Sequence, residues 1–234
     1  MSVLECKGLT KQYGRTLALD DVSFTLEEGR IVGLLGPNGS GKTTFIKLCN
    51  GLLTPSSGEL RICGYAPGKE SKALVSYLPD RPYLPNWMDV TQALDMYEDF
   101  YADFDRKRAL EMLAHLGIAE KQRIRQMSKG TKEKVQLILV MSRAAKLYLL
   151  DEPIGGVDPA TRDYILKTII TNYEPQSTVV ISTHLIADVE QALDQVIFID
   201  HGRIVLQSDT DLIRAEKGMS VDALFREVFK CSEN

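Results

Sequence analysis

The chain has 234 residues, of which 44% are hydrophobic and 26% are charged, and its formal net charge is -4. These values are typical of a globular protein with one large domain or two small ones, and they exclude a global electrostatic attraction to nucleic acid. No apolar run approaches the roughly 18 residues of a membrane span, and the start of the chain lacks the pattern of a signal peptide. The four cysteines have no C-x-x-C spacing, so we interpret them as reduced residues of a cytosolic protein, not as disulfides or a zinc site.

The first third of the chain carries strand signals on both sides of a glycine-rich loop. Residues 22–26 alternate apolar and polar side chains, which predicts a strand with one buried face before a turn at Glu28-Gly29. Residues 31–35 are almost wholly apolar, as in a strand buried in a parallel sheet. After the loop we expect a helix that ends near Gly51, a short strand and turn within residues 57–65, and a strand over residues 73–79.

The middle of the chain differs in character. From about residue 86 to 143 there is no strand candidate, and apolar and aromatic residues recur at helical spacing, as at Leu94, Tyr97 and Tyr101. Strand signals return at residues 146–151, 178–183 and 196–208, with helical stretches between them, and residues 220–229 indicate a short amphipathic helix. Alternation of strands and helices predicts an α/β fold of one domain, residues 1–234, with an all-helical insert at about 86–143.

The glycine-rich loop, GPNGSGKTT, fits the G-x-x-x-x-G-K-[ST] pattern between a buried strand and a helix. Its backbone N–H groups and the helix N-terminus attract anions, so the loop predicts a nucleotide site. Lys42 is placed to reach the β- and γ-phosphates, and the Thr43 hydroxyl is placed to hold Mg²⁺. The predicted nucleotide-binding residues are Gly36, Pro37, Asn38, Gly39, Ser40, Gly41, Lys42, Thr43 and Thr44.

Two further strands end in polar residues. The strand in KLYLLDEP ends at Asp151 and Glu152, and His184 follows the strand in VVISTHL. Because ligands bind at the carboxyl ends of parallel strands, we expect Asp151 to hold Mg²⁺ and Glu152 to act as general base on an attacking water. His184 is placed to position the water or the γ-phosphate. The alternative for these residues is a structural strand-end turn or a surface histidine.

The stretch MSKGTKEK, residues 127–134, precedes an apolar run. Taken alone it predicts a helix that begins after Ser128 as N-cap, with Gly130 as a flexible joint. The alternative is that the same helix N-terminus binds phosphate. The other motifs of the chain decide between the two.

In this order, GPNGSGKTT, MSKGT, YLLDEP, GGVD and STH resemble the motifs of the ATP-binding subunit of an ABC transporter, over essentially the whole chain. The resemblance implies a P-loop NTPase of the ABC type: a mainly parallel sheet core, an N-terminal antiparallel β region and the helical insert. It also implies that Tyr13 stacks on adenine and that Asp158 in GGVD lies at a dimer interface. Ser128, Lys129, Gly130 and Thr131 then form a signature that acts on the ATP of the partner chain.

The sequence departs from the family pattern in two places. Asp80 stands where the family usually has Gln; it can still ligate Mg²⁺, and it adds a negative charge. The usual Leu-Ser-Gly-Gly-Gln signature reads Met-Ser-Lys-Gly-Thr here, so Ser128 and Gly130 match it, whereas Lys129 and Thr131 do not. We expect the signature to function, with Lys129 adding positive charge near the triphosphate.

The resemblance implies an ATPase that dimerises around two Mg²⁺-ATP, with itself or with another ATP-binding subunit, and drives transport through a permease formed by other chains. We expect it at the inner face of the membrane, on the cytoplasmic side, without a nucleic-acid partner. The short tail favours export over import. A soluble ABC ATPase acting on ribosomes or DNA is the alternative, although the chain lacks a second cassette, a long coiled-coil insert and zinc cysteines. Glu152 and His184 argue against a non-catalytic subunit, and the absence of N-K-x-D argues against a GTPase.

Overall fold

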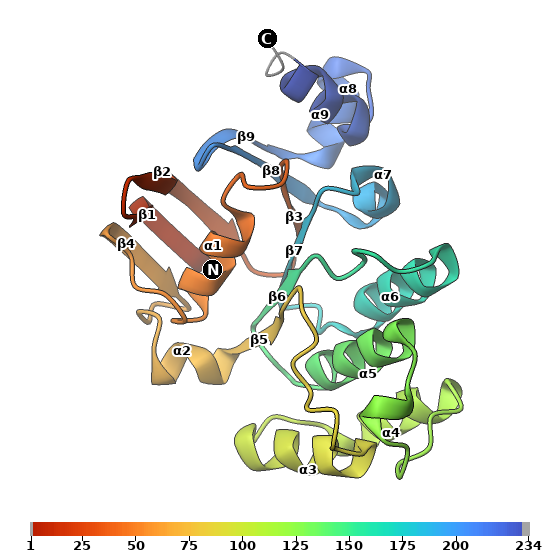
Figure 1. Cartoon of the computed structure of the whole chain (residues 1–234). Coiled ribbons are helices and arrows are strands. Elements are labelled where there is room, and N and C mark those ends of the chain that lie inside the picture. Colours follow the sequence, from red (N-terminus) through yellow and green to blue (C-terminus); the bar gives the residue numbers. More distant parts are fainter. Residues whose placement is uncertain (1, 231–234) are drawn as a thin grey trace.

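The computed structural model describes residues 2–230, and two β-sheets with helix α1 between them form its centre (Figure 1). The smaller sheet is antiparallel, in the order β2-β1-β4. Its strands are β1 (Ser2–Tyr13), β2 (Thr16–Glu27) and β4 (Ser57–Ile62). Helix α1 spans Lys42–Cys49. This sheet is the antiparallel N-terminal region that the sequence resemblance implies.

The larger sheet has the order β5-β6-β7-β3-β8-β9 and is parallel except for its last strand. Its strands are β3 (Ile31–Leu35), β5 (Val75–Leu78), β6 (Leu147–Asp151), β7 (Thr178–Thr183), β8 (Gln195–Asp200) and β9 (Arg203–Asp209). The carboxyl ends of β3, β6 and β7 meet at one edge, because these strands are parallel neighbours. The phosphate loop, Asp151 and Ser182 therefore lie along that edge.

Alternate residues of the larger sheet enter two different cores. Leu34, Leu149 and Ile197 pack on the side of α1 and the smaller sheet. Their neighbours Leu150 and Phe198 pack on the opposite side, against the helices that cover that face. Those helices are α5 (Lys129–Met141), α6 (Pro159–Asn172), α7 (Ile186–Val189), α8 (Thr210–Lys217) and α9 (Val221–Lys230), with a 3-10 turn at Glu190–Ala192. The mainly apolar strands predicted from the sequence are thus buried on both faces.

The helical insert has a hydrophobic core of its own. It contains α3 (Val90–Phe100), α4 (Arg106–His115), the 3-10 turn Ile124–Gln126 and α5. Helix α5 belongs to both parts, because Ile138 and Leu139 pack in the insert core whereas Leu137 and Met141 pack in the main core. The helix α5 is therefore packed against both the main core and the core of the insert.

Two elements differ from the sequence prediction. Residues 69–74 form the helix α2 (Lys69–Leu74), so the strand expected over residues 73–79 is β5 and begins only at Val75. The strand signal over residues 196–208 is a hairpin, in which β8 and β9 are joined by His201 and Gly202 at φ 44 and 77 degrees. Positive φ at both turn residues matches the twist of a two-residue hairpin.

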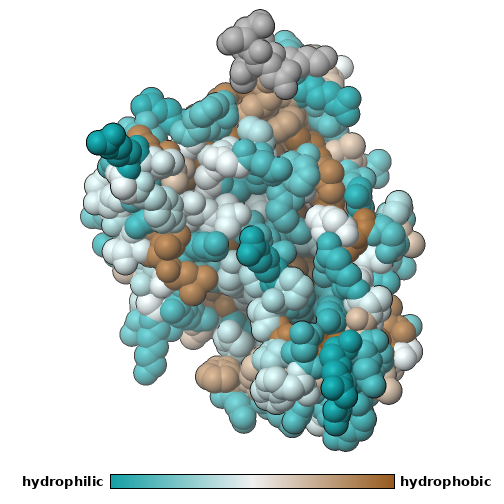
Figure 2. All heavy atoms as spheres, viewed as in Figure 1, coloured by the Kyte–Doolittle hydropathy of each residue, from teal (hydrophilic) through white to brown (hydrophobic). Residues whose placement is uncertain are grey.

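The surface in Figure 2 is mainly hydrophilic, with hydrophobic residues in small separate groups. None of the helices within residues 2–230 combines the length and apolar character that crossing a bilayer requires. Cys6, Cys49 and Cys63 are free thiols, and Cys231 lies outside the described residues.

Candidate functional site

The phosphate loop runs from the end of β3 into α1, and its glycines allow close approach of other backbone segments. A Cβ on Gly36 would lie 2.2 Å from the carbonyl oxygen of Ile199. Gly41 has φ +113, and a Cβ there would lie 2.6 Å from the carbonyl oxygen of Ala18. Side chains at these two positions would displace the loop. A cavity of about 240 Å³ lies over the loop, lined by Ala18, Asn38, Gly39, Ser40, Gly41, Lys42, Thr43, Thr44, Asp80 and Glu152.

Lys42 is a buried cation at the base of this loop. Its Nζ donates hydrogen bonds to the carbonyl oxygens of Gly36 at 2.7 Å and Pro37 at 3.0 Å, and it lies 3.9 Å from Glu152 Oε1. Burial lowers the pKa of Lys42, and the nearby carboxylates of Glu152 and Asp151 oppose that shift. The ammonium of Lys42 therefore lies among oxygen acceptors of the loop backbone and of Glu152.

Asp151 is wholly buried at the end of β6. Its Oδ1 accepts hydrogen bonds from Ser182 Oγ at 2.5 Å and from Thr43 Oγ1 at 3.2 Å. Its Oδ2 is buried and has no hydrogen-bond partner among the described residues. Burial raises the pKa of Asp151. An unpartnered carboxylate oxygen close to a threonine hydroxyl fits the hard oxygen ligands that Mg²⁺ prefers.

Glu152 follows Asp151 in a left-handed backbone conformation, with φ 50 degrees. His184 Nδ1 lies 3.1 Å from both carboxylate oxygens of Glu152, and Thr183 Oγ1 donates to Oε2 at 3.2 Å. A hydrogen bond from His184 to a carboxylate oxygen requires a proton on Nδ1, because such an oxygen is an acceptor. Glu152 is thus oriented by two neighbours at the edge of the cavity, and it can accept a proton there.

The predicted signature residues and Asp158 form a second group outside the cavity lining. Ser128 is the N-cap of α5, as predicted, and its Oγ accepts a hydrogen bond from the Thr131 amide at 3.2 Å. Lys129 Nζ donates to the Gly156 carbonyl at 3.0 Å. A Cβ on Gly130 would lie 3.8 Å from Asp158 Oδ2, so the signature lies next to the loop that carries Asp158.

Tyr13 belongs to neither group. It is 45% exposed at the end of β1, and Lys11 Nζ lies 5.2 Å from the centroid of its ring. Its aromatic face is therefore partly accessible at the surface, next to a cation.

Sequence reasoning missed three residues that shape the site. Ser182 and Thr183 donate hydrogen bonds to the carboxylates of Asp151 and Glu152, and both belong to the STH motif, in which the sequence predicts a role for His184 only. Gln136 accepts a hydrogen bond from the backbone N–H of Tyr83 at 2.8 Å, so it connects α5 to the segment that follows Asp80. The buried polar Gln in the apolar run after residue 134 was an available signal.

Comparisons with known proteins agree with this geometry. Residues 19–155 match the ABC transporter family profile. The linearmycin resistance ATP-binding protein LnrL of Bacillus subtilis is 32% identical over 90% of this chain and 70% of its own length. The daunorubicin resistance ATP-binding protein DrrA3 of Streptomyces coeruleorubidus is 28% identical over 94% of this chain and 72% of its own.

A solved structure of an ATP-binding subunit of an ABC transporter superposes with a TM-score of 0.87 at 29% identity, covering 96% of this chain and 98% of that one. It confirms the fold class expected from the sequence. Together with the family match and the phosphate loop, it leads to one conclusion: the chain belongs to the ABC transporter family, as its ATP-binding and ATP-hydrolysing subunit.

Proposed function

We propose that the chain acts as a dimer that closes around two Mg²⁺-bound ATP molecules, with a second copy of itself or with another ATP-binding subunit. The proposal is supported by the separation of the two residue groups within one chain. Ser128 and Gly130 do not line the cavity that holds Lys42 and Glu152. We propose that the N-terminus of α5 contacts a nucleotide in the cavity of a partner chain, with Asp158 nearby at the interface.

In this proposal each residue of the cavity has a separate role in binding. The loop amides of residues 36–44 and the ammonium of Lys42 hold the phosphates, and Tyr13 stacks on the adenine ring. Thr43, the free oxygen of Asp151 and Asp80 hold Mg²⁺. When bound, Mg²⁺ neutralises charge that develops on the phosphate oxygens during transfer.

The hydrolytic step rests on the placement of Glu152, 3.9 Å from Lys42 and fixed by His184 and Thr183. This placement is the observation that carries the proposal. Glu152 accepts a proton from a water as its oxygen attacks the γ-phosphorus, and the bond to the β–γ bridging oxygen breaks to leave ADP and phosphate. His184 keeps the carboxylate of Glu152 oriented and positions the γ-phosphate or the water.

The test is Glu152→Gln, which keeps the shape and removes the base. We expect ATP turnover to fall by about 10²- to 10⁴-fold, while ATP now accumulates a dimer in size-exclusion chromatography. Glu120→Gln, an exposed change on the helical insert, is the control and should leave both measurements unchanged. Turnover that survives Glu152→Gln, or no ATP-dependent dimer, contradicts the proposal.

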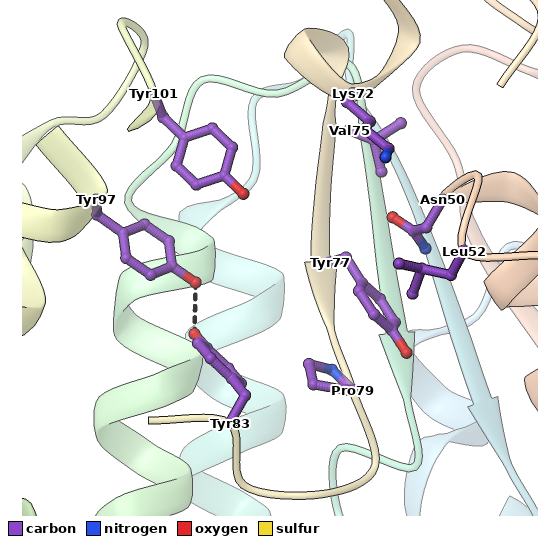
Figure 3. Close-up of a pocket in the computed structure, with 9 residues that line it drawn as sticks. All are labelled: Asn50, Leu52, Lys72, Val75, Tyr77, Pro79, Tyr83, Tyr97 and Tyr101. Carbon is purple, nitrogen blue, oxygen red and sulfur yellow. Dashed lines mark hydrogen bonds between the residues drawn. The ribbon is translucent and has the colours of Figure 1, made fainter. Parts of the chain in front are cut away.

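The membrane partner is expected to bind in a groove between the core and the helical insert. A cavity of about 370 Å³ there is lined by Asn50, Leu52, Lys72, Val75, Tyr77, Pro79, Tyr83, Tyr97 and Tyr101 (Figure 3). The hydroxyls of Tyr83 and Tyr97, which both line this cavity, are hydrogen-bonded to each other. Tyr83 follows Asp80, which lines the ATP cavity, by only three residues. The insert also exposes Trp87 and Phe100, which are 66% and 77% exposed. We propose that a helix of a permease made by separate chains docks here, on the cytoplasmic side.

We propose export as the direction of transport, because LnrL and DrrA3 are named for resistance to linearmycin and daunorubicin. The subunit would be co-expressed with the membrane protein encoded beside its gene, and daunorubicin would serve as the fluorescent probe. Inside-out vesicles should accumulate the probe when ATP is added outside, and Glu152→Gln should abolish this. ATP-dependent depletion of the probe from these vesicles would instead indicate import.

A further inference from the structure

Helix α5 begins with a lysine, which is electrostatically unfavourable because a helix N-terminus carries partial positive charge. Two oxygen acceptors offset this charge. Lys129 Nζ donates to the Gly156 carbonyl at 3.0 Å and lies 3.8 Å from Glu133 Oε1. Gly156 has φ +70, and a Cβ there would lie 2.6 Å from Nζ. The ammonium thus occupies the space that a side chain on Gly156 would fill.

The loop that Lys129 contacts runs from the proposed general base, Glu152, to the proposed dimer-interface residue, Asp158. Its first residue is Glu152, whose carbonyl accepts a hydrogen bond from the Gly155 amide at 3.0 Å. Its last residue is Asp158, which caps α6 by accepting from the amide and the hydroxyl of Thr161 at 3.0 and 2.7 Å. The loop is therefore fixed at both ends, and Lys129 holds its middle.

We propose that Lys129 is a positioning residue that couples the two ATP sites of the dimer. Its hydrogen bond to the Gly156 carbonyl links the signature, which contacts the ATP of the partner chain, to the loop that begins at this chain's own Glu152. A shift of the α5 N-terminus on closure is then transmitted to the loop through Gly156. This inference rests on the proposed dimer.

The alternative role for Lys129 is direct contact with the partner's phosphates. The two roles differ in their kinetic signature, because a phosphate contact acts mainly on nucleotide affinity and a positioning contact acts on the chemical step. The ion pair to Glu133 contributes little by itself, since the Lys129 side chain is 62% exposed. The hydrogen bond to the Gly156 carbonyl is the contact that matters here.

The experiment compares Lys129→Met and Lys129→Arg with Lys132→Met. Lys132 lies on the same turn of α5 and loses the same charge, but its Nζ contacts Asn86 Oδ1 at 3.1 Å and not the loop. We measure amide hydrogen exchange of residues 154–158 without nucleotide, then kcat and KM for Mg²⁺-ATP. Lys129→Met should speed loop exchange and lower kcat, each by about three- to tenfold, the effect of one ordinary hydrogen bond. KM should stay within about twofold.

Lys129→Arg should retain most of the wild-type behaviour, because it can still donate to the carbonyl, and Lys132→Met should change neither measurement. A raised KM with unchanged kcat in Lys129→Met would overturn the coupling in favour of a phosphate contact. Unchanged amide hydrogen exchange in Lys129→Met would show that the hydrogen bond to Gly156 does not restrain the loop, which would also overturn the coupling. If the wild-type chain itself neither turns over ATP nor dimerises, the proposed function fails and the coupling with it, which the Glu152→Gln experiment reveals separately.

Discussion

Two hydrogen bonds stabilise the buried carboxylate of Asp151, and the shorter one is donated by the hydroxyl of Ser182. Ser182→Ala removes this 2.5 Å contact and leaves Thr43 Oγ1, at 3.2 Å, as the remaining donor. Hydrogen bonds to charged groups contribute about 1.5 to 3 kcal/mol. We therefore expect the free energy of unfolding of the metal-free, nucleotide-free protein to fall by about 2 kcal/mol. For a chain of this size that is a Tm lower by about 4 to 8 °C.

The loss should depend on pH, and its sign follows from the protonation of Asp151. Burial raises the pKa of Asp151, whereas the hydroxyls of Ser182 and Thr43 lower it by stabilising the ionised form. Removing the Ser182 hydroxyl therefore raises the pKa further. The full destabilisation is present above the raised pKa of Asp151 in the variant. It shrinks as pH falls from there through the wild-type pKa, because a protonated carboxyl loses only a neutral hydrogen bond.

Urea unfolding followed by far-UV circular dichroism, in EDTA at about pH 8 and about pH 5, measures both effects. Ser76→Ala is the matched control: Ser76 is buried on β5 and donates to the neutral carbonyl of Val140 at 2.8 Å. Its loss should be about 1 kcal/mol and the same at both pH values. Equal, pH-independent losses in the two variants would refute the reasoning that Ser182 stabilises an ionised Asp151.

Two further outcomes follow from the burial of single groups. Lys42→Ala should lower ATP affinity by at least about tenfold in equilibrium dialysis, because it removes a positive charge that binds the phosphates. The circular dichroism spectrum should stay unchanged. Retained ATP affinity would show that the phosphates bind elsewhere. Burial raises the pKa of the Cys6 thiol to about 12, so iodoacetamide should label Cys6 only after unfolding, as mass spectrometry would report. Labelling of native Cys6 at neutral pH would contradict its burial in the core beneath β1.

The parts of the fold that the sequence predicted are those with a short-range signal. The strand Ile31–Leu35, the glycine loop and α1 are consecutive, so their pattern and their order predict both the elements and the anion site. The N-cap at Ser128 is equally local, because the cap bond spans three residues. The helical insert follows from the spacing of residues such as Leu94 and Tyr97, both of which lie in its core.

What the sequence did not predict depends on contacts between distant residues or on elements too short for a periodic pattern. Helix α2 has six residues and little apolar character, so it shows no amphipathic repeat. The pairing of Asp151 with Ser182 is set by the parallel register of β6 and β7, for which no residue in either strand is a marker. The hairpin after β8 did have a local signal, the His201-Gly202 pair between two apolar runs.

The adjacent carboxylates at the end of β6 pose one further question, because successive strand residues point to opposite faces. Asp151 keeps the strand geometry: it pairs with Ser182 and faces α1, where it meets Thr43. Glu152 leaves the strand with φ 50 degrees, a conformation that costs a non-glycine residue about 1 to 2 kcal/mol. That turn lets its carboxylate approach Lys42, so both acids line the edge of one site instead of opposite faces of the sheet. The strained backbone of Glu152 and the unpartnered oxygen of Asp151 are thus at adjacent residues. Both features lower the stability of the fold, and both belong to the candidate site.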